Sequence, residues 1–216
     1  MTVAGLLLAA GAGSRMGGPK ALLPWAGEPL VRRGIRLLSE GGCAPVVVVV
    51  GAAGEQVREQ VRAHGDHAAV VTAVDWATGM GASLRAGLAS LDDTVAACVV
   101  ALVDQPLVTA AAVERLRAAY ADGAVAAVAS YAGRARNPVL LERSTWAGVM
   151  AAAVGDEGAR GWLRRHPELV VQVDCTDVGA PDDLDTPGDL AALTARAEPA
   201  TDEPRPGQPT PIEGTL

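Results

Sequence analysis

One lysine, Lys20, closes a glycine-rich loop near the start of the chain, and every other Lys or Arg position is arginine. The loop runs from Gly11 to Lys20, follows an apolar run and also carries Arg15. An ammonium is a compact point charge, and a turn rich in glycine offers free backbone N–H groups. Such a loop after a buried strand indicates phosphate binding. Chance placement of a lone lysine in a loop of this length has odds of about one in twenty.

Two common phosphate-binding patterns fail on spacing. A P-loop has Ser or Thr directly after its lysine, whereas Lys20 is followed by Ala21. A dinucleotide fingerprint needs a third glycine, but Met16 stands there. It also needs an acidic residue after the next strand, where Val50 leads into Gly51. The loop therefore does not favour an NAD-binding site.

Acidic residues in two places are suited to a metal ion. Asp104 follows an apolar run and would lie at the carboxyl end of a buried strand, where ligands of parallel sheets bind. Asp183 and Asp185 alternate in an extended segment, which predicts that both point the same way. Carboxylates beside phosphates are usual Mg²⁺ ligands. Simpler roles stay open, because Asp104 could form a turn before proline and Asp185 could cap a helix.

A second glycine-containing segment, from Trp76 to Arg85, lies between a predicted strand and a predicted helix. Gly79 would let the backbone approach a ligand, and Ser83 would offer a hydroxyl in the first helical turn. A helix start with a capping Ser or Thr would have the same pattern.

Apolar runs alternate with helical periods, which predicts a mostly parallel sheet covered by helices. The predicted strands are Val3–Ala9, Pro45–Val50, Ala69–Val74, Thr94–Val103, Ala124–Ser130 and Leu169–Val173. The predicted helices are Pro29–Glu40, Gly54–Ala63, Gly79–Leu91, Thr109–Ala121 and Thr186–Ala197, with Thr109 as a candidate cap. Residues 1–197 are predicted to form one domain, and the proline-rich acidic stretch 198–216 a disordered tail.

Composition narrows the possible partners. A net charge of −7 argues against nucleic acid and anionic membranes, although a small anionic ligand needs only local positive charge. The three cysteines, Cys43, Cys98 and Cys175, have no zinc-like spacing, which predicts reduced thiols in a cytoplasmic protein. Neither a convincing signal peptide nor an apolar stretch of membrane-spanning length is expected.

The segment Leu8–Lys20 resembles the signature loop of nucleotidyltransferases that activate sugars, isoprenoid precursors and molybdopterin. Further matching segments are Trp76–Leu88, Asp104–Pro106, Arg136–Val139, Gly155–Arg160 and Asp183–Pro187. From residue 3 to about 195, the chain resembles the molybdenum cofactor cytidylyltransferases of the MobA-like nucleotidyltransferase group. The resemblance implies a Rossmann-like αβα sandwich of the α/β class, with Mg²⁺ as cofactor.

The resemblance also implies roles for particular residues. Catalytic roles fall to Arg15, Lys20 and Asp104, with Asp104 and Asp185 as metal ligands and Asp183 as the alternative to Asp185. The implied nucleotide-binding residues are Ala9, Ala10, Gly11, Ala12, Gly13, Ser14, Arg15, Lys20, Gly79 and Ser83. The implied acceptor-binding residues are Arg136, Asn137, Asp156 and Arg160, although two neighbouring arginines can equally form a solvated surface.

By this resemblance, the chain is expected to transfer CMP from CTP to a phosphorylated acceptor of the molybdopterin type. Ala10, in place of a glycine found in guanylyl-transferring relatives, leaves less room near the base and favours a pyrimidine. An apo-form molybdenum hydroxylase is a possible protein partner. Two alternatives are an NAD(P)H-dependent reductase of the nicotine blue oxidoreductase type, and a maturation or delivery factor for molybdenum hydroxylases.

Overall fold

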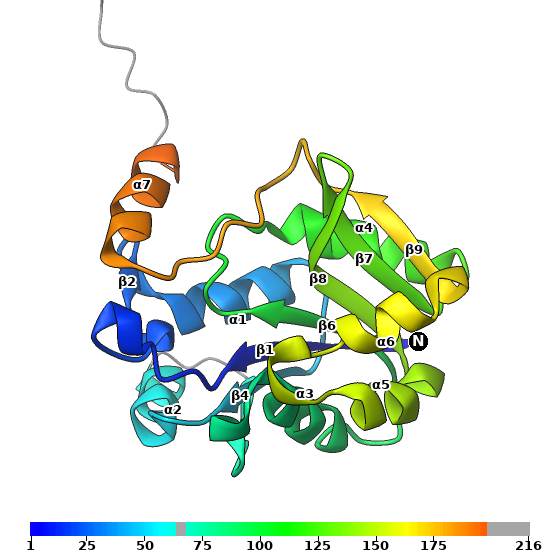
Figure 1. Cartoon of the computed structure of the whole chain (residues 1–216), viewed down its shortest axis with the longest axis horizontal. Coiled ribbons are helices and arrows are strands. Elements are labelled where there is room, and N and C mark those ends of the chain that lie inside the picture. Colours follow the sequence, from blue (N-terminus) through cyan, green and yellow to red (C-terminus); the bar gives the residue numbers. More distant parts are fainter. Residues whose placement is uncertain (64–67, 198–216) are drawn as a thin grey trace, which may run out of the picture.

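A seven-stranded sheet in the order β5-β4-β1-β6-β8-β7-β9 forms the centre of the protein (Figure 1). The computed structural model describes residues 1–63 and 68–197. The strands are β1 (Thr2–Ala9), β4 (Val46–Val50), β5 (Ala68–Thr72), β6 (Val95–Leu102), β7 (Ala126–Tyr131), β8 (Arg134–Glu142) and β9 (Val170–Asp174). Only β8 runs antiparallel to its neighbours β6 and β7 in this sheet. A separate two-stranded ribbon pairs β2 (Pro24–Trp25) with β3 (Glu28–Pro29).

Helices cover both faces of the sheet and make the predicted αβα sandwich (Figure 1). One face carries α1 (Leu30–Glu40), α2 (Gly54–Ala63) and α4 (Ala110–Ala121), while α7 (Pro187–Ala197) lies to one side of the sheet and adds Leu193 to the same core (Figure 1). The other face carries α3 (Met80–Ala89), α5 (Trp146–Ala152) and α6 (Arg160–Arg165). Short 3₁₀ turns lie at Ser14–Met16, Lys20–Leu22, Trp76–Thr78, Arg143–Thr145, Gly155–Glu157 and Pro167–Leu169.

The all-valine strand β4 shows why the apolar runs become central strands. Val46, Val48 and Val50 pack into the core below α1 and α2, whereas Val47 and Val49 pack into the core below α3. Successive side chains of a strand point to opposite faces, so a strand buried on both faces needs an unbroken apolar run. The mostly parallel order and the helical cover are therefore as predicted.

The sequence prediction lacked the antiparallel strand β8, the short strands β2 and β3 and the short helices α5 and α6. The first half of β8 is exposed and polar, so the pattern of a buried strand is visible only from Val139 onward. Thr109 occupies the predicted N-cap position of α4, but its hydroxyl donates to the carbonyl of Val178 at 2.5 Å and makes no capping hydrogen bond. The predicted tail, 198–216, lies outside the described residues.

The segment between β9 and α7 crosses the carboxyl edge of the sheet (Figure 1). Leu184 is fully buried within it, and its N–H donates to the carbonyl of Asp104 at 2.8 Å. The acidic residues on either side of Leu184 are thereby held beside the end of β6. Within the two described ranges, no helix is long and apolar enough to cross a membrane.

Candidate functional site

The loop after β1 has a conformation that requires glycine. Gly13 has φ +60, and a Cβ there would lie 1.9 Å from the carbonyl oxygen of Gly18. The N–H groups of Met16 and Gly18 both donate to the carbonyl of Gly13, which closes the loop on itself. The N–H groups of residues 11–13 have no acceptor among the described residues. Oriented and unpaired amides of this kind can bind an anion.

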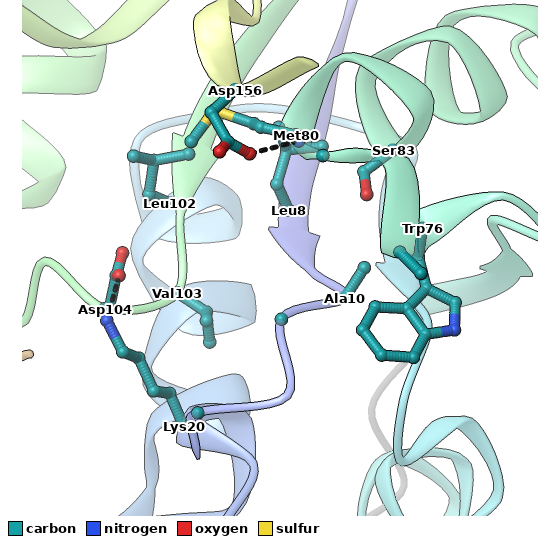
Figure 2. Close-up of a pocket in the computed structure, with 14 residues that line it drawn as sticks. Leu8, Ala10, Lys20, Trp76, Met80, Ser83, Leu102, Val103, Asp104 and Asp156 are labelled. Carbon is teal, nitrogen blue, oxygen red and sulfur yellow. Dashed lines mark hydrogen bonds and ion pairs between the residues drawn. The ribbon is translucent and has the colours of Figure 1, made fainter. Parts of the chain in front are cut away.

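Lys20, at the end of this loop, lies between two carboxylates from distant parts of the chain. Its Nζ is 2.8 Å from Oδ2 of Asp104 and 2.5 Å from Oδ1 of Asp185. Figure 2 shows Lys20 reaching up to Asp104 at one end of the site. Arg15 lies farther out, with Nη1 at 3.7 Å from Oδ2 of Asp185. The structure therefore brings together the predicted cations and carboxylates.

The charges in this cluster shift one another's protonation. Burial lowers the pKa of Lys20, but the hydrogen bonds and negative charges of Asp104 and Asp185 outweigh it, so that pKa is raised overall. The hydrogen bond from Lys20 holds the pKa of Asp185 below its usual value. Both groups are thus held in their charged forms at neutral pH.

Asp183 has a different partner from Asp185. Its Oδ1 accepts a hydrogen bond from Nε2 of Gln105 at 2.9 Å. Desolvation raises the pKa of the Asp183 carboxyl, and the nearby charges of Asp104 and Asp185 add to this effect. The two-residue separation of Asp183 and Asp185 predicts that both side chains point the same way, but of the two only Asp185 bonds to Lys20. Asp185 is therefore the better second ligand for a cation beside Asp104.

A pocket of about 310 Å³ opens beside this cluster (Figure 2). It is lined by Leu8, Ala10, Gly11, Gly13, Lys20, Trp76, Ala77, Gly79, Met80, Ser83, Leu102, Val103, Asp104 and Asp156. Ser83 is 4% exposed, and its hydroxyl points into the pocket (Figure 2). The predicted site residues that do not line this pocket are Ala9, Ala12, Ser14, Arg15, Arg136, Asn137, Arg160 and Asp185.

Glycines at the start of α3 allow a neighbouring segment to pack closely. A Cβ on Gly79 would lie 2.4 Å from the carbonyl carbon of Gly155, and a Cβ on Gly81 would lie 2.5 Å from the carbonyl oxygen of Ala153. Asp156 then accepts a hydrogen bond from the N–H of Met80 at 3.2 Å. The predicted freedom of the backbone at Gly79 therefore serves close contact with residues 153–156, of which Asp156 lines the pocket.

The four predicted acceptor residues do not lie together around the pocket. Asp156 lines it, but Arg136 is exposed and Asn137 half-buried in the first half of β8. Arg136 donates to the adjacent carbonyl of Ala135 at 3.2 Å. Arg160 is exposed at the start of α6. Of the four, Asp156 is thus the one that borders the pocket in the described structure.

Sequence reasoning assigned no role to several apolar residues of the pocket. Leu8 and Leu102 lie at the ends of neighbouring strands, and Met80 begins α3. Trp76 is the largest of them and carried a signal, because it precedes Gly79 in a chain with only four tryptophans. Aromatic walls with a few polar groups are typical of small-ligand sites.

The donor set fits a hard divalent cation. No group of three or more His, Cys, Asp or Glu side chains suited to a metal ion occurs in residues 1–63 and 68–197. Asp104 and Asp185 nevertheless converge on one cationic atom, the Nζ of Lys20. Mg²⁺ needs only one or two protein carboxylates when phosphates and water supply its other ligands. The two carboxylates are therefore sufficient for an ion that arrives with a phosphate ligand.

Comparison with known proteins agrees with this geometry. The MobA-like NTP transferase domain family matches residues 5–170. Nicotine blue oxidoreductase of Paenarthrobacter nicotinovorans is 39% identical over 192 residues, which cover 85% of this chain and 92% of that protein. A probable molybdenum cofactor guanylyltransferase of Opitutus terrae is 37% identical over 133 residues, covering 58% and 59% of the two chains.

A solved structure is similar over nearly the whole chain. Rv0371C of Mycobacterium tuberculosis H37Rv, crystallised in complex with manganese, superposes with a TM-score of 0.71 at 27% identity. The match covers 90% of this chain and 99% of that one. The αβα architecture described above is thus shared with a protein that binds a divalent metal in its crystal.

Proposed function

Because this chain belongs to the MobA-like NTP transferase family and is an enzyme of the nucleotidyltransferase type, we propose that it transfers CMP from CTP to a phosphorylated acceptor of the molybdopterin type. The observation that carries the proposal is the position of Lys20. It closes a loop with unpaired N–H groups and lies between two carboxylates at the edge of a pocket.

The loop provides the positive end of this site. A triphosphate beside residues 11–13 would accept hydrogen bonds from their free N–H groups, while Lys20 and Arg15 would neutralise its charge. Charge increases on the leaving pyrophosphate as the reaction proceeds, so fixed cations stabilise the transition state more than the bound substrate. Lys20 must then exchange its carboxylate partners for phosphate oxygens.

Asp104 and Asp185 would hold Mg²⁺ in the same region, and the ion would supply further neutralisation of phosphate charge. The manganese complex of the related Rv0371C supports a divalent cation. With the ammonium of Lys20 drawn to phosphate, the two carboxylates would become free for the ion.

The chemical step needs no side-chain base. An oxygen of the acceptor phosphate monoester attacks the α-phosphorus of CTP in line, a new P–O bond forms, and the bond to the β-phosphate oxygen breaks with release of pyrophosphate. The acceptor oxygen is already anionic, so the contribution of the protein is positioning and electrostatic stabilisation. The scarcity of candidate bases agrees with this, because among the described residues Asp104 and Asp156 are the acidic ones that line the pocket.

The choice of cytosine as the base and of molybdopterin as the acceptor type each depend on separate observations. The Cβ of Ala10 and the buried Ser83 border the pocket where a base would lie, and a close wall suits a pyrimidine better than a purine. The molybdopterin-type acceptor is supported by the sequence resemblance and by the named guanylyltransferase relative, which belongs to molybdenum cofactor chemistry.

A pyrophosphate-release assay across nucleotides tests the proposal. Purified protein with Mg²⁺ and a molybdopterin-type acceptor should release pyrophosphate from CTP faster than from GTP, ATP or UTP. Asp104→Asn should slow release by about a hundredfold or more, because it removes a carboxylate that would hold the Mg²⁺ that stabilises the charge of the transition state. Asp122→Asn is the matched control, since Asp122 ends α4 and does not line the pocket. Near-normal release by Asp104→Asn would reject the assignment.

A reductase is the second candidate, and the 39% identity to nicotine blue oxidoreductase favours it. Thermal unfolding with added ligands separates the two candidates. CTP with Mg²⁺ should raise the melting temperature, and NADPH should leave it unchanged. Stabilisation by NADPH alone would favour the reductase.

A further inference from the structure

Trp76 differs from the other three tryptophans in its exposure to the pocket. Trp25, Trp146 and Trp162 are each no more than 5% exposed and belong to the two cores. Trp76 is partly exposed and lines the pocket. In Figure 2 its indole lies just below Ala10, on the side opposite Lys20 and Asp104. One large aromatic surface is thus available to a ligand in this site.

The position of the indole is set by the backbone next to it. A Cβ on Gly51 would lie 2.5 Å from Cγ of Trp76 and 2.6 Å from the carbonyl oxygen of Ala10. That carbonyl accepts a hydrogen bond from the N–H of Ala52 at 3.2 Å. The absent side chain of Gly51 therefore makes room for Trp76 against the start of the glycine loop.

Charge divides the pocket into two ends. Lys20 and Asp104 occupy one end, while Trp76 and Ala10 form an apolar wall at the other (Figure 2). The buried hydroxyl of Ser83 is directed into the space near this wall. An apolar face with one polar group suits a flat heterocycle, whereas the charged end suits phosphates.

We propose that the indole of Trp76 is the surface on which the nucleobase of the bound nucleotide rests. The inference rests on the proposed nucleotidyl transfer and adds a base-binding residue to it. Every base has a π-face, so stacking on the indole supplies affinity, and the Cβ of Ala10 beside the indole takes up part of the space next to the base.

Fluorescence tests the contact directly, because a stacked base quenches indole emission. CTP with Mg²⁺ should quench the emission of the wild type, whereas inorganic tripolyphosphate should raise the melting temperature without quenching. Trp76→Phe should keep CTP affinity within a few-fold and lose the quenching. Trp76→Ala should bind CTP about 5- to 150-fold more weakly by calorimetry, the range for loss of one stacking partner.

Trp162→Phe is the matched control, because it removes a buried indole that stacks on His166 and leaves the pocket intact. Its emission should still be quenched by CTP. Unchanged CTP affinity in Trp76→Ala, or a CTP-induced rise in melting temperature without quenching, would overturn the role of Trp76 and leave the proposed function standing. Absence of any CTP binding by the wild type would reject both.

Discussion

Replacing Lys20 with methionine tests the centre of the site, because the substitution removes the cation and keeps an unbranched side chain. The side chains of Lys20 and Asp104 are 17% and 22% exposed, so their charged hydrogen bond is only partly screened. Such a bond contributes about 1.5–3 kcal/mol. The Asp185 side chain is 43% exposed, so its bond to Lys20 contributes nearer ~0.2–1 kcal/mol.

Burial of an apolar methionine offsets part of this loss, and we expect the free energy of unfolding to fall by about 2–3 kcal/mol. For a chain of this size, that corresponds to a melting temperature lower by about 4–12 °C. Denaturant unfolding and thermal melts near neutral pH measure both quantities. Arg62→Met is the control, because within residues 1–63 and 68–197 Arg62 makes an exposed 3.6 Å ion pair with Glu55, and the loss of that pair should change stability little.

The pH dependence has a definite sign. The pKa of Asp185 is lowered in the folded protein, so its stabilisation is present above the unfolded pKa and is lost as pH falls through the folded pKa. The pKa of Lys20 is raised, so its stabilisation is present below the unfolded pKa and is lost as pH rises through the folded pKa. The stability difference between wild type and Lys20→Met should therefore be constant from about pH 5 to about pH 9.

That difference should shrink in acid, below about pH 4. A difference that grows on acidification, or one too small to measure at neutral pH, would refute the charge pairing. Under the proposed function, the variant should also release pyrophosphate about a hundredfold more slowly or worse, because it lacks a cation that would neutralise the leaving group.

Three further outcomes are expected. Asp189→Ala removes the carboxylate that accepts a hydrogen bond from the N–H of Asp185 at the start of α7. It should lower the free energy of unfolding by about 1 kcal/mol in denaturant unfolding and raise the Mg²⁺ concentration needed for activity. An unchanged Mg²⁺ titration would speak against a role of Asp189 in positioning Asp185. Gly13→Ala places a Cβ against the carbonyl of Gly18 and should abolish the CTP-induced melting shift while the circular dichroism stays native; a normal shift would show that the loop tolerates the change. The thiol of Cys98 is fully buried and its pKa is raised by desolvation, so a thiol reagent should modify it only after unfolding.

Local patterns in the sequence were sufficient for most of the fold. The valine run of β4 and the helical spacing of α1 each indicate which faces of the element are buried. Alternation of such strand and helix patterns along the chain implies a parallel sheet covered by helices. The strand β8 escaped prediction because its first residues are polar and exposed, and because its antiparallel direction depends on pairing with β6 and β7. Such pairing is a long-range property with little local signal.

The same division holds for the site. The glycine loop, Lys20 and the position of Asp104 after a buried strand follow from the sequence, since each depends on a few adjacent residues. The contacts of Lys20 with Asp104 and Asp185 span 84 and 165 positions of the chain, and only the folded sheet brings them to one place. Tertiary packing also decided that Asp185, and not Asp183, meets the ammonium, because Asp183 instead accepts a hydrogen bond from the side chain of Gln105.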